Sequence, residues 1–212
     1  MSDHDPQCLL YVALEPGPGS GQRLAAALDA AEVSAVLVRP RRGDRLGAGE
    51  TKPLVDLCKK AGVAALVADD AALARTLRAD GVHLTAGADL LGRLQDARAR
   101  LGKSALIGAD PGISRHEAME AAEAGADYVA FCAPETVRDR AGAIATRDEL
   151  VAWWADVFEI PCVAFDAADA EEARRLALAG ADFVVAALPD GVEDIAGYVA
   201  AFSDAIGAEH GS

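Results

Sequence analysis

The sequence predicts an α/β protein, a single (β/α)8 TIM barrel, from three observations. Short apolar runs alternate with stretches whose apolar residues recur at helical spacing, and the alternation repeats eight times. The apolar runs are nearly continuous, as in parallel strands that helices cover on both faces. No Pro/Ser-rich linker and no shift of composition divides the 212 residues, so one domain is expected.

Eight strands are expected at the apolar runs. In chain order these runs are Leu9 to Leu14, Ala35 to Val38, Ala64 to Ala68, Val82 to Leu84, Ala105 to Ile107, Tyr128 to Cys132, Cys162 to Phe165 and Phe183 to Ala187. Right-handed crossovers and the lack of an unpaired antiparallel run favour a closed barrel. An open, doubly wound sheet is the alternative.

The stretches between the strands are expected to be helices. They run over Ala25 to Ala31, Leu54 to Ala61, Ala71 to Asp80, Leu90 to Leu101, His116 to Ala124, Asp148 to Val157, Ala170 to Ala179 and Ile195 to Ile206. Five of them are followed by a glycine, where a left-handed cap needs a residue without Cβ. These glycines are Gly62, Gly81, Gly102, Gly125 and Gly180.

The composition is that of an acidic globular protein. The chain has 20 Lys and Arg against 34 Asp and Glu, a formal charge of −14. Such a field repels a phosphate backbone, so no nucleic acid partner is expected. The apolar runs are far shorter than the roughly 20 residues that span a bilayer, so no membrane contact is expected either. We expect residues 1–7 to be extended or disordered, 8–207 to form the barrel and 208–212 to be a tail.

The polar N-terminus favours a cytoplasmic protein. Residues 1–7 are polar and carry Asp3 and Asp5, where a signal peptide would need positive charge and then an apolar stretch. The four cysteines are widely spaced and contain no C-x-x-C pair. They are therefore expected to be free, buried thiols that act as small hydrophobic side chains.

Charged and polar residues follow the predicted strands, at the end of the barrel where the chemistry of such folds gathers. In strand order they are Glu15; Arg39, Arg41 and Arg42; Asp69 and Asp70; His83 and Thr85; Asp110, Ser114, Arg115 and His116; Glu135, Thr136 and Arg138; Asp166; and Asp190. Mg²⁺ takes carboxylates together with phosphate oxygens, and Arg binds phosphate through its fork. The pattern predicts a phosphorylated ligand held with a divalent ion.

Several of these residues also have a purely structural interpretation. Asp70 could cap the helix that begins at Ala71. His116 could be an exposed first-turn residue, and Arg41, Arg42 and Arg45 could form a solvated basic loop. His83 lies inside an apolar run, which favours a core histidine over a catalytic one.

Four motifs carry a family resemblance. They are Ala68-Asp-Asp-Ala, Asp80-Gly-Val-His-Leu, Ile107-Gly followed by Ser114-Arg-His, and Gly125-Ala-Asp-Tyr-Val. Their order and spacing resemble the thiamine phosphate synthase (thiamine-phosphate pyrophosphorylase) family of TIM barrels, which includes the regulator-like TenI branch. The resemblance covers roughly residues 8 to 190, and Gly-Val-His-Leu about a dozen residues after the Asp-Asp pair is its most specific part.

The resemblance implies a Mg²⁺-dependent transfer. The nitrogen of a thiazole phosphate displaces pyrophosphate from hydroxymethylpyrimidine pyrophosphate, which gives thiamine phosphate. By position, Asp69 and Asp89 resemble the metal carboxylates. The residues that resemble substrate-binding positions are Arg39, Arg41, His83 and Arg138, and those that resemble catalytic positions are Ser114 and His116.

The chain also departs from the family pattern. The family's lysine after strand six is absent, and only Arg138 or Arg140 could partly replace it. Its Gly-Gly loop after strand seven, which binds the thiazole phosphate, is Phe165-Asp-Ala-Ala here. The pyrophosphate half of the site is thus expected to be kept and the thiazole-phosphate half lost.

The departures keep two other functions open. One is a catalytically inactive, TenI-like paralogue that binds a thiamine-related ligand or a protein partner. The other is a different phosphosugar-type barrel reaction. Homo-oligomerisation stays open as well.

Overall fold

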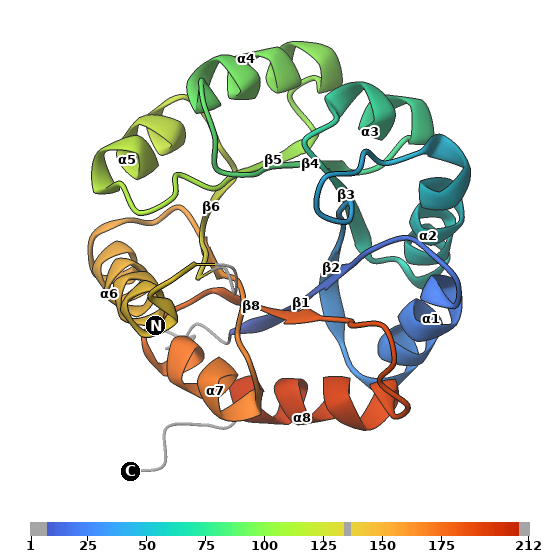
Figure 1. The fold of residues 1–212 in the computed structure, drawn as a ribbon. Coiled ribbons are helices and arrows are strands. Elements are labelled where there is room, and N and C mark those ends of the chain that lie inside the picture. The colour runs from blue at the N-terminus through green and yellow to red at the C-terminus, as the bar shows by residue number, and fades with distance from the viewer. Residues whose placement is uncertain (1–7, 134–136, 208–212) are drawn as a thin grey trace, which may run out of the picture.

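Eight parallel strands close into a barrel in the computed structural model, which describes residues 8–133 and 137–207 (Figure 1). The strands are β1 (Leu9–Leu14), β2 (Val33–Val38), β3 (Ala64–Ala68), β4 (Gly81–Leu84), β5 (Leu106–Ala109), β6 (Tyr128–Phe131), β7 (Cys162–Ala164) and β8 (Phe183–Ala187). Each strand pairs in parallel with the next, and β8 pairs with β1. The predicted fold class is confirmed. The two predicted tails, Glu135 and Thr136 lie outside the described residues.

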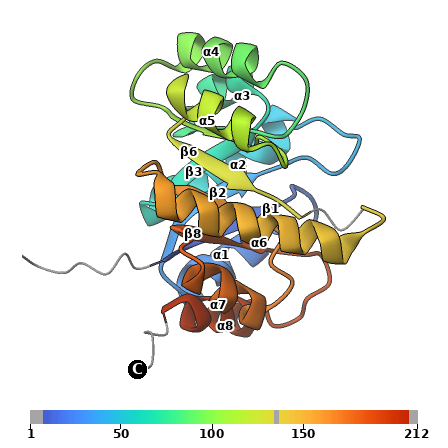
Figure 2. The same cartoon turned by 90° about the vertical axis from the view of Figure 1, so that its left-hand side faces the viewer.

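In the part of the chain that the structure describes, eight helices surround the barrel (Figures 1 and 2). They are α1 (Ser20–Ala30), α2 (Ala48–Ala61), α3 (Ala71–Leu77), α4 (Leu90–Leu101), α5 (Arg115–Glu123), α6 (Arg140–Val157), α7 (Ala170–Leu178) and α8 (Ile195–Gly207). The last helix packs against both α1 and α7, which closes the outer ring. Within the described ranges, no helix combines the length and the apolar character that crossing a membrane requires.

The core has two layers, because each strand buries side chains on both faces. The larger layer lies between the strands and the helices. The smaller layer fills the inside of the barrel, with Tyr11, Leu37, Leu66, Tyr128 and Phe165 among its members. Side chains thus fill the inside of the barrel, and the chemistry of such folds gathers at the rim where the loops after the strands lie.

Four of the five predicted glycines, Gly62, Gly102, Gly125 and Gly180, have positive φ angles at the ends of their helices. Gly62 has the predicted left-handed conformation, whereas Gly102, with a ψ of −177°, caps α4 outside that region. The prediction for Gly81 was wrong. Helix α3 ends earlier, at Leu77, and Arg78 takes the left-handed conformation instead. Gly81 is the first residue of β4, and a Cβ there would lie 1.9 Å from the backbone oxygen of Leu106. This glycine is needed for close strand packing.

Three helices begin well before their predicted starts. Helix α1 starts at Ser20, where the prediction had Ala25. Helix α2 starts at Ala48 and contains Pro53, a residue that sequence reading takes as a boundary. Helix α6 starts at Arg140, where Asp139 caps it by accepting a hydrogen bond from the Gly142 N–H. The earlier start places Arg147 inside a helix and buries it.

Candidate active site

A cavity of about 750 Å³ lies at the carboxyl ends of β1, β2, β7 and β8. Its charged lining residues are Glu15, Arg39, Arg41, Arg42, Asp166 and Asp190. The sequence placed each of these residues directly after a strand, and parallel strands bring such residues to one rim. The two predicted phosphate-binding arginines, Arg39 and Arg41, are therefore brought together.

The two arginines differ in their surroundings. Arg41 forms an ion pair with Asp190, and its Nε lies 3.6 Å from a Glu15 carboxylate oxygen. Asp190 is shared with helix α1, because Arg23 Nη2 lies 2.6 Å from its other oxygen. Arg39 has no ion-pair partner among the described residues. Of the two, Arg39 is the one whose charge is not already balanced.

Asp69 follows β3 and has a left-handed backbone, with a φ of 56°. Its Oδ1 accepts hydrogen bonds from the Thr85 N–H at 2.8 Å and from Arg93 Nη2 at 2.6 Å. Its Oδ2 accepts from the Thr85 hydroxyl at 2.6 Å. These contacts from Thr85 of the β4–α4 loop and from Arg93 of α4 fix the carboxylate at the rim while leaving 39% of the side chain exposed.

Asp89 lies on that same loop and caps α4. Its Oδ1 accepts from the Gly92 N–H at 3.2 Å. Among residues 8–133 and 137–207, no group of three or more His, Cys, Asp and Glu is placed to hold a metal ion. Mg²⁺ commonly takes only one or two carboxylates and completes its shell with water and substrate phosphates. Asp69 and Asp89 offer hard oxygen donors of the kind that such a site uses, but neither residue lines the cavity that holds Arg39 and Arg41.

The predicted catalytic pair lies at the start of α5. Ser114 is the N-cap, and its Oγ accepts from the Glu117 N–H at 3.2 Å. The His116 side chain is 77% exposed, with Nε2 3.5 Å from a Glu120 carboxylate oxygen. Neither residue lines the cavity beside Arg39, and neither does Arg138, which is exposed ahead of α6. The structure does not bring these three residues to the two arginines.

His83 lies inside the barrel. Its Nδ1 is 2.9 Å from the Tyr128 hydroxyl, which is 3.2 Å from the hydroxyl of Tyr11. The imidazole stacks on Tyr128 and on Phe165. Burial lowers the pKa of His83 to about 4, so the ring is neutral at physiological pH. These contacts match the core interpretation of this histidine.

We expect His83 to make stability depend on pH. Its pKa is about 4 in the folded chain and 6.5 ordinarily, so the unfolded chain binds the proton first as pH falls. Above pH 6.5 the neutral His83 makes its full contribution to the free energy of unfolding. As the pH falls toward 4, that free energy decreases by about 3 kcal/mol. Urea unfolding at several pH values should show a smaller acid loss in His83→Gln than in the wild type. Equal losses would contradict the expectation.

Sequence reasoning missed Arg93, which contacts both Asp69 and the backbone oxygen of Thr85. The available signal was its position four residues after Asp89, in the first turn of a helix that follows a strand end.

Asp110 was noted only as a strand-end residue. It is buried, which raises the pKa of its carboxyl, while a hydrogen bond from the Gly112 N–H opposes that shift.

Asp166 stands where the family resemblance leads one to expect glycine. Its φ is 61°, a conformation that glycine adopts freely and that Asp tolerates better than most residues. Its backbone oxygen accepts hydrogen bonds from Arg140 and Arg147 of α6. The loop after β7 therefore has a left-handed backbone at this position without a glycine.

Comparison with protein families matches residues 13–188 to TMP-TENI, described as thiamine monophosphate synthase. A thiamine-phosphate synthase from Erythrobacter litoralis is 43% identical over 183 residues, which cover 84% of each chain. One from Hyphomonas neptunium is 37% identical over 192 residues, again 84% of each. The matched segment begins within β1 and ends just after β8, so it includes nearly the whole barrel.

Solved structures share the fold. Thiamine phosphate pyrophosphorylase from Pyrococcus furiosus has a TM-score of 0.75 and 22% identity, covering 93% of this chain and 95% of that one. A tryptophan synthase structure from Mycobacterium tuberculosis has a TM-score of 0.76 at 16% identity, with 96% and 94% covered. At such identities the likeness concerns the fold alone.

Proposed function

This chain belongs to the TMP-TENI family of thiamine monophosphate synthases, and from that membership we propose that it joins hydroxymethylpyrimidine pyrophosphate to thiazole phosphate. The products are thiamine phosphate and pyrophosphate. The observation that carries the proposal is the juxtaposition of Arg39 and Arg41 at one rim cavity, in a chain 43% identical to a thiamine-phosphate synthase. An inactive paralogue is not favoured by these relatives.

In the proposed reaction, this chain stabilises the departing pyrophosphate. Arg39 and Arg41 offer planar N–H forks that suit phosphate oxygens. Asp69 and Asp89 would hold Mg²⁺, which supplies positive charge that neutralises the leaving group. The cavity wall of Ala13, Leu14 and Leu188 limits water beside the pyrimidine cation that forms as pyrophosphate leaves.

The remaining predicted residues keep narrower roles in this proposal. Ser114 and His116 act only if ligand binding brings the start of α5 toward the cavity that holds Arg39 and Arg41. Arg138 would supply the positive charge that the family places on a lysine after strand six. Synthesis in the cytoplasm suits the free cysteines at positions 8, 58, 132 and 162, because a reducing compartment keeps such thiols unpaired.

The two arginines should differ in a substitution test. We expect Arg39→Gln to raise KM for the pyrimidine pyrophosphate about 30-fold, since a charge-assisted hydrogen bond contributes about 2 kcal/mol. Arg41→Gln should raise it less, because Asp190 competes with the substrate for that guanidinium. Steady-state kinetics of both variants check this order. A larger effect at Arg41 would contradict it.

The function is tested by incubating the purified chain with both substrates and Mg²⁺ and measuring thiamine phosphate by chromatography. We expect stoichiometric product and pyrophosphate, and no product when EDTA removes the metal. Reactions that omit either substrate are the controls. If no product forms at micromolar enzyme while the Erythrobacter litoralis relative is active in the same assay, the proposal fails.

A further inference from the structure

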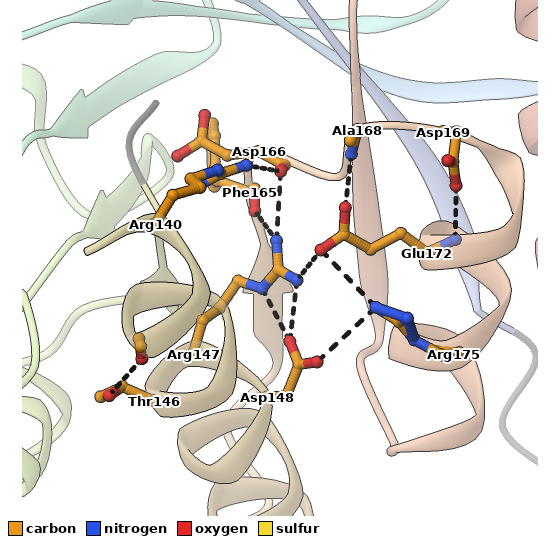
Figure 3. Close-up of polar contacts among 11 residues, drawn as sticks. Arg140, Thr146, Arg147, Asp148, Phe165, Asp166, Ala168, Asp169, Glu172 and Arg175 are labelled. Carbon is orange, nitrogen blue, oxygen red and sulfur yellow. Dashed lines mark hydrogen bonds and ion pairs between the residues drawn. The ribbon is translucent and has the colours of Figure 1, made fainter. Parts of the chain in front are cut away.

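Arg147 of α6 is a buried cation whose hydrogen bonds lead to the loop after β7 (Figure 3). Its Nη1 donates to the backbone oxygens of Phe165 at 3.0 Å and Asp166 at 3.2 Å. Its Nη2 donates to Glu172 of α7, and Nε and Nη2 both donate to Asp148. The side chain is 0% exposed, so solvent replaces none of these contacts.

Glu172 holds the other end of the same loop. One carboxylate oxygen accepts from Arg147, and the other accepts from the Ala168 N–H at 2.7 Å. Its side chain is 7% exposed. Together the pair fixes three backbone groups within four consecutive residues, at positions 165, 166 and 168. Figure 3 shows the guanidinium and the carboxylate facing each other between α6 and α7.

The charges of this cluster cancel. Asp148 and Arg175 stand at its outer side, with Arg175 Nη2 3.9 Å from Asp148 and 3.7 Å from Glu172. Two cations and two carboxylates therefore surround the loop without adding a net negative field. An anion approaching the loop meets no extra repulsion from the cluster that holds it.

Peptide geometry links the pair to the cavity. In a planar trans peptide the N–H points opposite to the C=O of the preceding residue. Arg147 draws the oxygens of Phe165 and Asp166 toward α6, so the N–H groups of Asp166 and Ala167 point away from it. Both residues line the rim cavity, and Arg147 does not. Successive N–H groups beside a left-handed residue are a common anion-binding arrangement.

We propose that Arg147 and Glu172 are positioning residues that orient the Asp166 and Ala167 N–H groups toward the phosphate of the thiazole substrate. The inference rests on the proposed function and explains how a loop without the family's glycines could bind that group. The loops after strands seven and eight are the usual phosphate site of such barrels. The left-handed Asp166 is held by contacts that a glycine would not need.

The test compares a double variant with a surface control. Arg147→Met with Glu172→Leu removes both charges and keeps apolar volume, a change that buried ion pairs often tolerate without loss of stability. We expect KM for thiazole phosphate to rise about tenfold or more, and KM for the pyrimidine pyrophosphate to change less than about twofold. Arg174→Gln, on the exposed side of α7, should match the wild type.

A conservative variant separates positioning from folding. Arg147→Lys keeps the charge but loses the fork, and its KM for thiazole phosphate should fall between the wild type and the double variant. If the variants lower kcat per total protein and the melting temperature while both KM values stay unchanged, the role is structural and the proposal is overturned. An equal rise of both KM values overturns it as well.

Hydrogen exchange gives a readout that does not need activity. Amides at 165–169 should exchange about tenfold faster or more in the double variant, while β1 to β5 exchange as in the wild type. Inorganic phosphate should slow exchange of this loop in the wild type and not in the double variant. These results with an inactive wild type would reject the synthase function and keep the positioning role. An unchanged loop, or equal protection by phosphate in both proteins, would reject the positioning role whatever the activity.

Discussion

Asp69→Asn should lower kcat/KM for thiamine phosphate formation about 10³-fold, or about 4 kcal/mol in transition-state stabilisation. The amide keeps an oxygen that can accept from the Thr85 N–H, and Asn tolerates the left-handed backbone at this position. What is lost is the negative charge that would hold Mg²⁺ beside the pyrophosphate. Steady-state rates at saturating Mg²⁺ measure the loss.

The adjacent carboxylate is the matched control for this prediction. Asp70 caps α3 by accepting from the Leu73 N–H, and Asn caps helices about as well as Asp. Asp70→Asn should therefore change the rate less than about threefold. Comparable losses at both positions would mean that Asp69 acts through the local fold, and a fully active Asp69→Asn would remove it from the metal site.

Gly81→Ala should destabilise the chain by about 4 kcal/mol or more, which places it among the largest single-substitution effects. The added Cβ would lie 1.9 Å from the Leu106 oxygen and 2.7 Å from its carbonyl carbon. Both are backbone atoms of β5, so no side-chain rotation relieves the clash and the two strands must separate. Chemical denaturation at neutral pH measures the loss.

Gly49→Ala is the opposite case. This glycine is exposed in the first turn of α2, and a Cβ there meets nothing within 4 Å. Alanine should stabilise the chain by about 0.5 kcal/mol, through helix propensity and a less flexible unfolded state.

If Gly81→Ala unfolds at the same denaturant concentration as the wild type, the close approach of β4 and β5 is not rigid.

The barrel could be predicted from the sequence because strands that are buried on both faces consist almost entirely of apolar residues. The run at 9–14 is apolar throughout, and β1 occupies the same residues. Helix starts were harder, since Pro53 and Gly142 disfavour helices locally while tertiary packing overrides them. The prediction of a helix cap at Gly81 was wrong for a related reason, because a glycine after a helical stretch can lie either in the turn or in the next strand.

The part of the candidate site that directly follows a strand end could be predicted from the sequence. Arg39 and Arg41 follow β2 directly, and the strand end brings them to the cavity. The pairing of Arg41 with Asp190 was not predictable, because 149 residues separate them and only barrel closure brings them together. Arg147 was missed because it lies outside the predicted helix, and an arginine read as part of a loop is expected to be exposed.

Asp190 acts as a counterion that the chain itself supplies. It joins Arg23 of α1 to Arg41 after β2, so the loop following the last strand is tied to the beginning of the barrel. An anion that binds Arg41 must exchange for this carboxylate. Added salt weakens the Arg41–Asp190 pair and the pair of Arg41 with the bound anion alike, because one negative group replaces another. The affinity of an anion for Arg41 should therefore depend less on ionic strength than its affinity for Arg39. The exchange would also leave Arg23 of α1 as the one ion-pair partner of Asp190 among the described residues.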